Sequence, residues 1–341
     1  MTPAWAGARI RVGVCLSLTG RYATFGAQAA HGLKSWATLD GGAEIVVIDD
    51  RSEPSQVAAA LSELVNRCDL LLGPYSTQLM RAANRVIGDL DRVLWNHGGS
   101  GDDVETATPG HVVSVLAPTS RYAEPYVQLL ANRIPNAPLF LRCGQGRFGV
   151  QVVDGAERAA VEFGLRTQRL SQEAHLPTDN DEEWDFFCAA TFPEDVATVR
   201  QALGLPRPPR TLGTVAAGVQ EFGREIRAPR GIYGIAQWMP GRSADVCLGP
   251  PESGFIREYR QATGQMPDYP AVQAAAAAVL ATHCARTAGD VARSALWAAA
   301  TSLRATTLFG PFGIDPTTGE QQDHRPVLTR WTAEGLVSAA V

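Results

Sequence analysis

The order of short apolar runs and helical patterns constrains the fold of this chain more than any other feature. An apolar strand at 9–16 is followed by a helical pattern at 26–39, and this pair of elements recurs along the sequence to residue 236. Such alternation predicts β-α-β units with parallel strands. The expected strands are 9–16, 44–48, 70–72, 93–95, 137–142, 167–170, 184–189, 210–215 and 232–236; the expected helices are 26–39, 54–67, 76–90, 118–132, 149–163, 193–203, 254–263 and 270–288.

The alternation runs through two successive cycles, the second starting near residue 118. A chain of 341 residues exceeds the size of one typical hydrophobic core, so two sheets of similar layout indicate two lobes. We therefore predict an α/β fold of two Rossmann-like, doubly wound lobes. No long linker separates the cycles, and the tail at 307–341 contains strand-like pieces joined by Pro, Gly and Asp turns.

The amino-acid composition and net charge argue against several classes of function. Hydrophobic residues make up 45% and charged residues 19%, which is typical of a globular protein with a substantial core. The net charge of -5 argues against nucleic acid and anionic membrane surfaces as partners. No apolar run approaches the roughly 18 residues of a membrane span, so direct membrane insertion is not expected.

The N-terminal stretch 1–9 has neither the charged start nor the long apolar region of a signal peptide. Two locations therefore stay open. The protein is cytoplasmic if Met1 is the native start, and it belongs to the cell envelope, periplasmic or lipid-anchored, if an export signal has been trimmed.

The cysteines point to no metal or redox chemistry. None of the six forms a C-x-x-C pair, and most lie in apolar segments where they resemble small core residues. The sequence also contains no metal-ligand cluster and no credible pair of catalytic carboxylates. We expect no metal, no cofactor and no catalysis.

In open parallel sheets, ligands bind where loops follow the carboxyl ends of strands and lead into helix N-termini. After the first strand, Gly20 and Gly26 bracket Tyr22 and Phe25, which predicts an aromatic cover over a ligand or, alternatively, a helix-capping loop. No Gly-Lys-Ser/Thr follows, so this segment is not a phosphate-binding P-loop.

The loops after the third and fourth strands carry hydroxyls and glycines. In 73–78, Ser76 or Thr77 is suited to cap a helix or to bind a ligand carboxylate, and both interpretations stay open. In 96–101, the glycines allow a ligand to approach the backbone closely. His97-Gly98-Gly99 also resembles an esterase oxyanion loop, but no G-x-S-x-G with a partner triad accompanies it, which argues against a hydrolase.

The segment 144–149, Gly-Gln-Gly-Arg-Phe-Gly, formally matches the G-x-G-x-x-G dinucleotide motif between a strand and a helix. The acidic residue expected after the next strand is met only loosely by Glu173, and a whole similar lobe precedes the motif. A dinucleotide-dependent oxidoreductase is therefore a remote alternative. The preferred interpretation makes Phe148 an aromatic wall of a binding site.

Taken together, these segments resemble the type I periplasmic solute-binding proteins, the branched-chain amino-acid, amide and urea receptors of ABC transporters. Each segment is a weak signal alone, but their order and spacing over nearly the whole chain are specific. The segments that carry the resemblance are 10–14 with 18–20 and 25–26, Asp49-Asp50, 72–76, Gln237-Trp238, Tyr259 with 263–264 and 267–269, and 308–312 with 314–315 and 318–319.

The resemblance implies a Venus-flytrap fold with a three-stranded hinge and the ligand held in the cleft between lobes. It places lobe I at 1–119 plus 240–322 and lobe II at 120–239 plus 323–341. It also implies ligand-binding roles for matching positions of both lobes, which are Phe25, Tyr75, Ser76, Thr77, Gly98, Ser100, Phe148, Thr191 and Phe192.

One departure from the family bears on the ligand. Amino-acid binders of this class place a carboxylate soon after the strand at 210–215 to pair the ligand ammonium, but 213–216 contains no acid. An unpaired buried ammonium is costly. A neutral polar ligand, an amide or a carboxylate with an apolar tail therefore fits better, and substitution by Glu194, Asp195 or Glu221 stays open.

The expected function is non-catalytic binding of a small polar ligand by the solute receptor of an ABC uptake system. Its partners are the ligand and, if the protein is exported, an ABC permease. The alternative is a cytoplasmic amide-type sensor of the same fold, whose partner is a regulatory protein.

Overall fold

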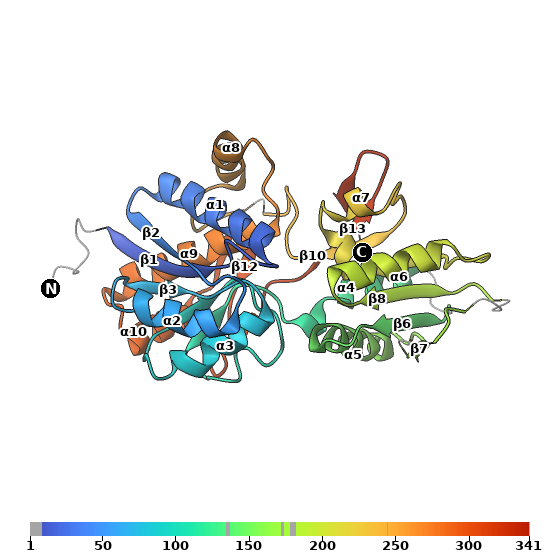
Figure 1. The fold of residues 1–341 in the computed structure, drawn as a ribbon, viewed down its shortest axis with the longest axis horizontal. Helices are drawn as coiled ribbons and strands as arrows, with labels where there is room; N and C mark the ends of the chain where they lie inside the picture. Colours follow the sequence, from blue (N-terminus) through green and yellow to red (C-terminus); the bar gives the residue numbers. More distant parts are fainter. Residues whose placement is uncertain (1–8, 134–136, 172–173, 178–181, 244, 341) are drawn as a thin grey trace. The chain divides into compact units, whose positions relative to one another are not determined.

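A computed structural model describes residues 9–133, 137–171, 174–177, 182–243 and 245–340 (Figure 1). The chain divides into two compact units. Unit 1 comprises Met1–Ala117 and Pro240–His324, and unit 2 comprises Pro118–Met239 and Arg325–Val341. The chain therefore passes from one unit to the other three times. The predicted acid Glu173 and most of the N-terminal stretch 1–9 lie outside the described residues.

Among its described residues, unit 1 contains a five-stranded parallel sheet with the order β2-β1-β3-β4-β5. Helices α1 and α8 lie on one side of this sheet, and α2 and α3 lie on the other (Figure 1). The elements are β1 (Ile10–Leu16), α1 (Ala23–Asp40), β2 (Ala43–Asp49), α2 (Pro54–Leu64), β3 (Leu70–Leu72), α3 (Thr77–Ile87), β4 (Leu94–Asn96), β5 (Val112–Ser114), α8 (Glu252–Thr263), α9 (Tyr269–Ala288), α10 (Arg293–Ser302), β11 (Ala305–Thr307) and β12 (Gly310–Phe312).

Helix α9 forms the centre of unit 1. Its residues from Pro270 to Thr282 are all buried, and most of them are alanines. Helix α1 packs directly against it. A Cβ atom on Gly32 of α1 would lie 2.2 Å from the carbonyl oxygen of Ala271, so only glycine permits this approach. Small side chains thus bring the two helices together.

In the described part of unit 2, seven strands pair in the order β14-β13-β10-β9-β8-β6-β7. The strands β6 to β10 are parallel, whereas β13 and β14, which come from the tail with the predicted strand-like pieces, pair antiparallel at one edge of the sheet. The elements are η1 (Thr119–Arg121), α4 (Glu124–Arg133), β6 (Leu139–Cys143), α5 (Arg147–Glu162), β7 (Thr167–Leu170), β8 (Asp185–Ala189), α6 (Phe192–Leu203), β9 (Thr211–Thr214), η2 (Val215–Gly218), α7 (Phe222–Glu225), β10 (Tyr233–Ala236), β13 (Val327–Trp331) and β14 (Leu336–Ser338).

The two faces of this sheet have separate hydrophobic clusters. Leu139 and Leu141 of β6 belong to the cluster beneath α4 and α5, whereas Phe140 between them belongs to the cluster beneath α6. Successive side chains of a strand point to opposite faces, which explains this division. Helices α5 and α6 therefore cover opposite faces of the sheet.

Several elements differ from the sequence prediction, among them η2 and the short helix α7, which no expected helix covers. Strand β5 and helix α10 were not expected, because β5 follows β4 without an intervening helix and α10 buries only Leu296 and Ala300. The helix predicted at 118–132 is a 3-10 turn followed by α4. Pro125 explains the break, because proline lacks an N–H and is tolerated in a helix only within the first turn.

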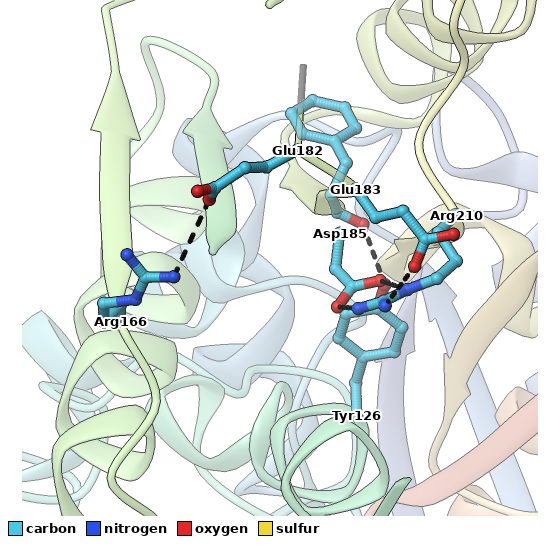
Figure 2. Close-up of polar contacts among 7 residues, drawn as sticks. Tyr126, Arg166, Glu182, Glu183, Asp185 and Arg210 are labelled. Carbon is cyan, nitrogen blue, oxygen red and sulfur yellow. Dashed lines mark hydrogen bonds and ion pairs between the residues drawn. The ribbon is translucent and has the colours of Figure 1, made fainter. Parts of the chain in front are cut away.

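A buried ion pair braces unit 2 at the amino ends of β8 and β9 (Figure 2). Asp185 is only 1% exposed, and its Oδ2 lies 2.8 Å from Nη2 of Arg210, which also binds Glu183 at 2.7 Å. The Tyr126 hydroxyl donates to the carbonyl of Phe186 at 3.0 Å in the same region. These groups lie at the opposite edge of the sheet from the loops that follow the strands.

No helix in the described ranges combines the length and the apolar character that crossing a membrane requires.

Candidate ligand-binding loops

Asn96 organises the loop that follows β4 in unit 1. Its side chain is fully buried at the end of the strand. Its Oδ1 accepts hydrogen bonds from the backbone N–H groups of Gly98 and Gly99 at 3.1 and 2.8 Å, and its Nδ2 donates to the Gly99 carbonyl and the Ser114 hydroxyl at 2.6 Å each. One amide side chain thus pairs with both N–H donors and a carbonyl acceptor of the loop backbone.

The loops after β3 and β4 form one contiguous surface. The N–H of Ser76 donates to the carbonyl of Gly98 at 3.0 Å, and a Cβ atom on Gly98 would lie 2.5 Å from Cα of Tyr75. Ser76 itself has a φ of 111°, a conformation that L residues rarely adopt. A position predicted to bind ligand is therefore one of the sites of backbone strain in the described structure.

The hydroxyls of Ser76 and Thr77 both support this surface. Ser76 Oγ caps α3 by accepting from the N–H of Leu79 at 3.3 Å, and Thr77 Oγ1 accepts from the N–H of Gly101 at 3.0 Å. A hydroxyl that accepts one hydrogen bond still has a proton to donate. The capping and ligand-binding interpretations are therefore compatible.

Four rings, Tyr22, Phe25, Tyr75 and Tyr269, form an aromatic cluster beside these loops. Phe25 stacks on Tyr75 with centroids 4.9 Å apart and planes 10° apart, and Tyr22 meets Tyr75 edge-on at 6.2 Å. The hydroxyls of Tyr75 and Tyr269 lie 2.5 Å apart. The sequence prediction missed Tyr269; its position at the start of α9, after the cap Asp268, was the available signal.

The loop after β1 is held by the loop after β2. Asp49 accepts from the N–H groups of Leu18 and Thr19, and Ser52 Oγ donates to the carbonyl of Thr19 at 2.8 Å. Asp50 is fully buried, and its Oδ1 accepts from Ser17 Oγ at 2.6 Å. The Asp49-Asp50 pair therefore orders the segment that presents Tyr22 and Phe25.

The structure brings together five predicted site residues of unit 1: Phe25, Tyr75, Ser76, Thr77 and Gly98. Ser100 is buried in the same loop as Gly98.

In unit 2, the three predicted residues do not form such a group. Phe148 lies on α5, where it meets Tyr122 edge-on at 5.8 Å and packs against the cluster beneath that helix. Phe192 packs against the cluster beneath α6, on the other face of the sheet. Thr191 Oγ1 donates to Glu194 Oε2 at 2.6 Å in a capping box at the start of α6.

The three acids considered as substitutes for the missing carboxylate have different surroundings. Glu194 is engaged in the capping box, and Glu221 pairs with Arg224 at 3.1 Å on the surface. Asp195 is 1% exposed, and its Oδ2 accepts from the N–H of Ala216, just beyond β9, at 3.4 Å. Burial raises the pKa of Asp195 to about 7.

The described residues contain no group of three metal-ligating side chains. The segment that resembles a dinucleotide motif leads into α5, with Gly146 as its N-cap.

A family model described as periplasmic binding protein matches residues 9–191, which is more than half of the chain. The chain belongs to the periplasmic binding protein family. This finding confirms the resemblance inferred from the strand-end loops. A sequence comparison with curated proteins finds no significant match.

Solved structures share the fold over nearly the whole chain. A leucine-binding protein from Thermotoga maritima has a TM-score of 0.79 at 15% identity, covering 97% of this chain and 98% of its own. A solute-binding protein of an ABC transporter from Rhodopseudomonas palustris, in complex with 4-hydroxybenzoate, has a TM-score of 0.78 at 16% identity, covering 98% and 96%.

A branched-chain amino-acid transporter substrate-binding protein from Streptococcus pneumoniae, in complex with isoleucine, has a TM-score of 0.73 at 14% identity, covering 97% and 99%. These similarities confirm the predicted α/β type I periplasmic binding fold.

Proposed function

We propose that this protein is the solute receptor of an ABC uptake system and binds a small ligand without converting it. The observation that carries the proposal is the aromatic cluster beside the hydroxyls of Ser76 and Thr77 and the loop at Gly98. This arrangement offers an apolar wall and a few convergent polar groups, which is the usual composition of a small-molecule site. Family membership and the solved neighbours support it.

The favoured ligand is a carboxylate with an apolar or aromatic body. The N-terminus of α3 supplies backbone N–H groups and a partial positive charge beside the two hydroxyls. The guanidinium of Arg21 lies 4.4 Å from the ring centroid of Tyr22 and is hydrogen-bonded to Gln78. The solved neighbours include complexes with 4-hydroxybenzoate and isoleucine.

Contacts from unit 2 are part of the same proposal. Phe148 and Phe192 are partly exposed beside the ends of β6 and β8, where the family resemblance implies ligand contacts. Thr191 is the weakest of the three candidates, because its hydroxyl already donates to Glu194.

A ligand panel tests the proposal by calorimetry and thermal unfolding. The panel contains 4-hydroxybenzoate, benzoate, leucine, isoleucine and the amides of these acids. A ligand that binds only the native state stabilises it by about 2.7 kcal/mol at a hundredfold excess over Kd. Phe25→Ala should weaken binding at least tenfold, whereas Phe163→Ala, which truncates an exposed ring on unit 2, should leave Kd unchanged. No response to any member would contradict the proposal, and so would chemical conversion of a bound ligand.

The proposed partner is an ABC permease, because solved structures of this fold are described as solute-binding proteins of ABC transporters. A regulatory protein is the alternative if the chain works in the cytoplasm. The genomic DNA upstream of the coding sequence distinguishes them. An in-frame export signal or a lipoprotein cysteine supports the permease and a cell-envelope location, and neighbouring regulatory genes without a permease support the sensor.

A further inference from the structure

Glu105 is a buried acid of unit 1, in the loop that connects β4 and β5. It is only 4% exposed. Its Oε1 accepts a hydrogen bond from the hydroxyl of Ser114 on β5, and Nδ2 of Asn96 on β4 lies 3.5 Å from the same oxygen. Asn96 and Ser114 are paired in the register of the two strands, so one carboxyl oxygen meets the ends of both.

These contacts connect Glu105 to the backbone of the candidate ligand-binding loop. Asn96 Nδ2 donates to Ser114 Oγ at 2.6 Å, and Ser114 in turn donates to Glu105. Oδ1 of the same Asn96 accepts from the N–H groups of Gly98 and Gly99. Because hydrogen bonds in such a chain polarise one another, a change of charge at Glu105 alters the bonds that hold the loop.

The surroundings of Glu105 favour its neutral form. Burial is the main cause that raises its pKa to about 7, and the charge of Glu320, in the segment hydrogen-bonded to β5, raises this pKa further. Arg81 of α3 is already engaged by Asp103, with Nε and Oδ2 2.7 Å apart. Strands β4 and β5 carry no titratable side chain. Glu105 therefore loses its proton against both burial and a like charge.

We propose that Glu105 is a positioning residue of the ligand site, whose neutral form holds the loop at Gly98, so that binding of an anionic ligand takes up a proton. The inference rests on the site proposed above for a carboxylate ligand. Ionisation of Glu105 adds a buried negative charge next to the loop that receives this carboxylate, and water and salt screen buried charges only weakly. By linkage, a ligand that prefers the protonated form raises the proton affinity of Glu105 by the same factor.

Ligand affinity should therefore be highest in acid and fall as pH rises through 7. We expect a fall of about fivefold between pH 5.5 and pH 9, which is the lower end of coupling between sites in proteins. A coupling of this size corresponds to the uptake of about 0.3 proton per ligand at pH 7. His97, next to Gly98, has a pKa lowered to about 4, so it does not titrate in this interval.

NMR of the free protein tests the connection without a ligand. The backbone amide resonances of Gly98 and Gly99 should shift together between pH 5.5 and pH 9, with one midpoint near 7. Glu105→Gln keeps an acceptor for Ser114 but cannot ionise, so it should abolish the shift. His111→Gln removes another titratable side chain of the same loop and should leave the shift intact. Resonances that stay still in the wild type, or that titrate equally in Glu105→Gln, overturn the inference.

Calorimetry with benzoate, which stays ionised throughout this interval, tests the linkage to binding. Titrations in two buffers with different enthalpies of ionisation give the number of protons taken up. We expect uptake of about 0.3 proton at pH 7 in the wild type and none in Glu105→Gln, which should keep the acid-limit affinity at every pH. Glu105→Ala should bind at least fivefold more weakly at every pH, because Ser114 loses its acceptor.

The outcomes separate this inference from the proposed function. Binding of benzoate to the wild type without proton uptake at pH 7 overturns the inference and leaves the receptor function standing. Absence of binding by the whole ligand panel contradicts the proposed function instead, and the resonances of Gly98 and Gly99 then decide whether Glu105 controls the loop.

Discussion

Replacement of Asn96 by alanine tests whether one buried amide holds the loop that carries Gly98 and Ser100. The substitution removes the acceptor for two backbone N–H groups and the donor to the Gly99 carbonyl and Ser114. Each buried polar group left unsatisfied costs about 1–3 kcal/mol, although the rearranged loop regains part of this from water. We expect Asn96→Ala to lower the free energy of unfolding of unit 1 by about 3 kcal/mol.

The loop should lose ligand affinity together with stability. Gly98 accepts from the N–H of Ser76, so a displaced loop also releases the strained turn at the start of α3. Urea unfolding gives the stability change, and calorimetry with the best ligand of the panel gives the affinity change, which we expect to exceed tenfold.

Asn84→Ala is the matched control for this experiment. Asn84 is also buried in unit 1 and donates one hydrogen bond, 2.6 Å long, to the carbonyl of Val104. Its loss should cost about 1 kcal/mol and leave Kd within twofold. The reasoning is refuted if Asn96→Ala costs less than its control, or if the unfolding energy falls while the affinity stays unchanged.

Three further predictions concern buried charge. Arg210→Met strands the buried carboxylate of Asp185 and should destabilise unit 2 by about 3 kcal/mol, measured by hydrogen exchange of β8 and β9, while adding Asp185→Asn should recover most of the loss. Burial raises the pKa of Glu105 to about 7. Its favourable contribution to the free energy of unfolding is therefore complete below the unfolded pKa near 4.5 and is lost as pH rises through 7. In urea titrations, the free energy of unfolding of Glu105→Gln should rise by about 3 kcal/mol relative to that of the wild type between pH 4 and pH 8. Burial lowers the pKa of His97 to about 4, so its contribution to the free energy of unfolding is complete above pH 6.5 and falls as pH drops towards 4. If the free energy of unfolding of His97→Gln has the same slope against pH as that of the wild type over this interval, the lowered pKa of His97 is contradicted.

Local periodicity predicted most of the fold because long helices and buried strands have strong sequence signals. The strands Leu70–Leu72 and Thr167–Leu170 have the predicted bounds, and α9 begins within one residue of its predicted start. Strand β5 was missed because it follows β4 without an intervening helix, so the alternation of strands and helices gives no signal for it. The antiparallel pairing of β13 with β10 was not foreseen because β10 lies about ninety positions earlier in the chain.

The candidate site was predictable where it follows strand ends. Phe25, Ser76 and Gly98 lie together because parallel strands end at one edge of a sheet. Tyr269 could not be placed, since it reaches Tyr75 across 194 positions from a helix whose docking is a tertiary event. The capping role of Thr191 was readable in the sequence, because Thr-Phe-Pro-Glu matches the pattern of a capping box.

The alanine-rich helix α9 determines how unit 1 can respond to a ligand. A methyl group has no rotamers, so the buried alanines of α9 hold no side-chain disorder that binding could reduce. Gly32 and Ala271 are already as close as their backbones allow, and a close-packed contact of this kind resists compression. The contact between α1 and α9 is therefore stiff, and we expect a ligand to order the loops of unit 1 rather than to shift these two helices.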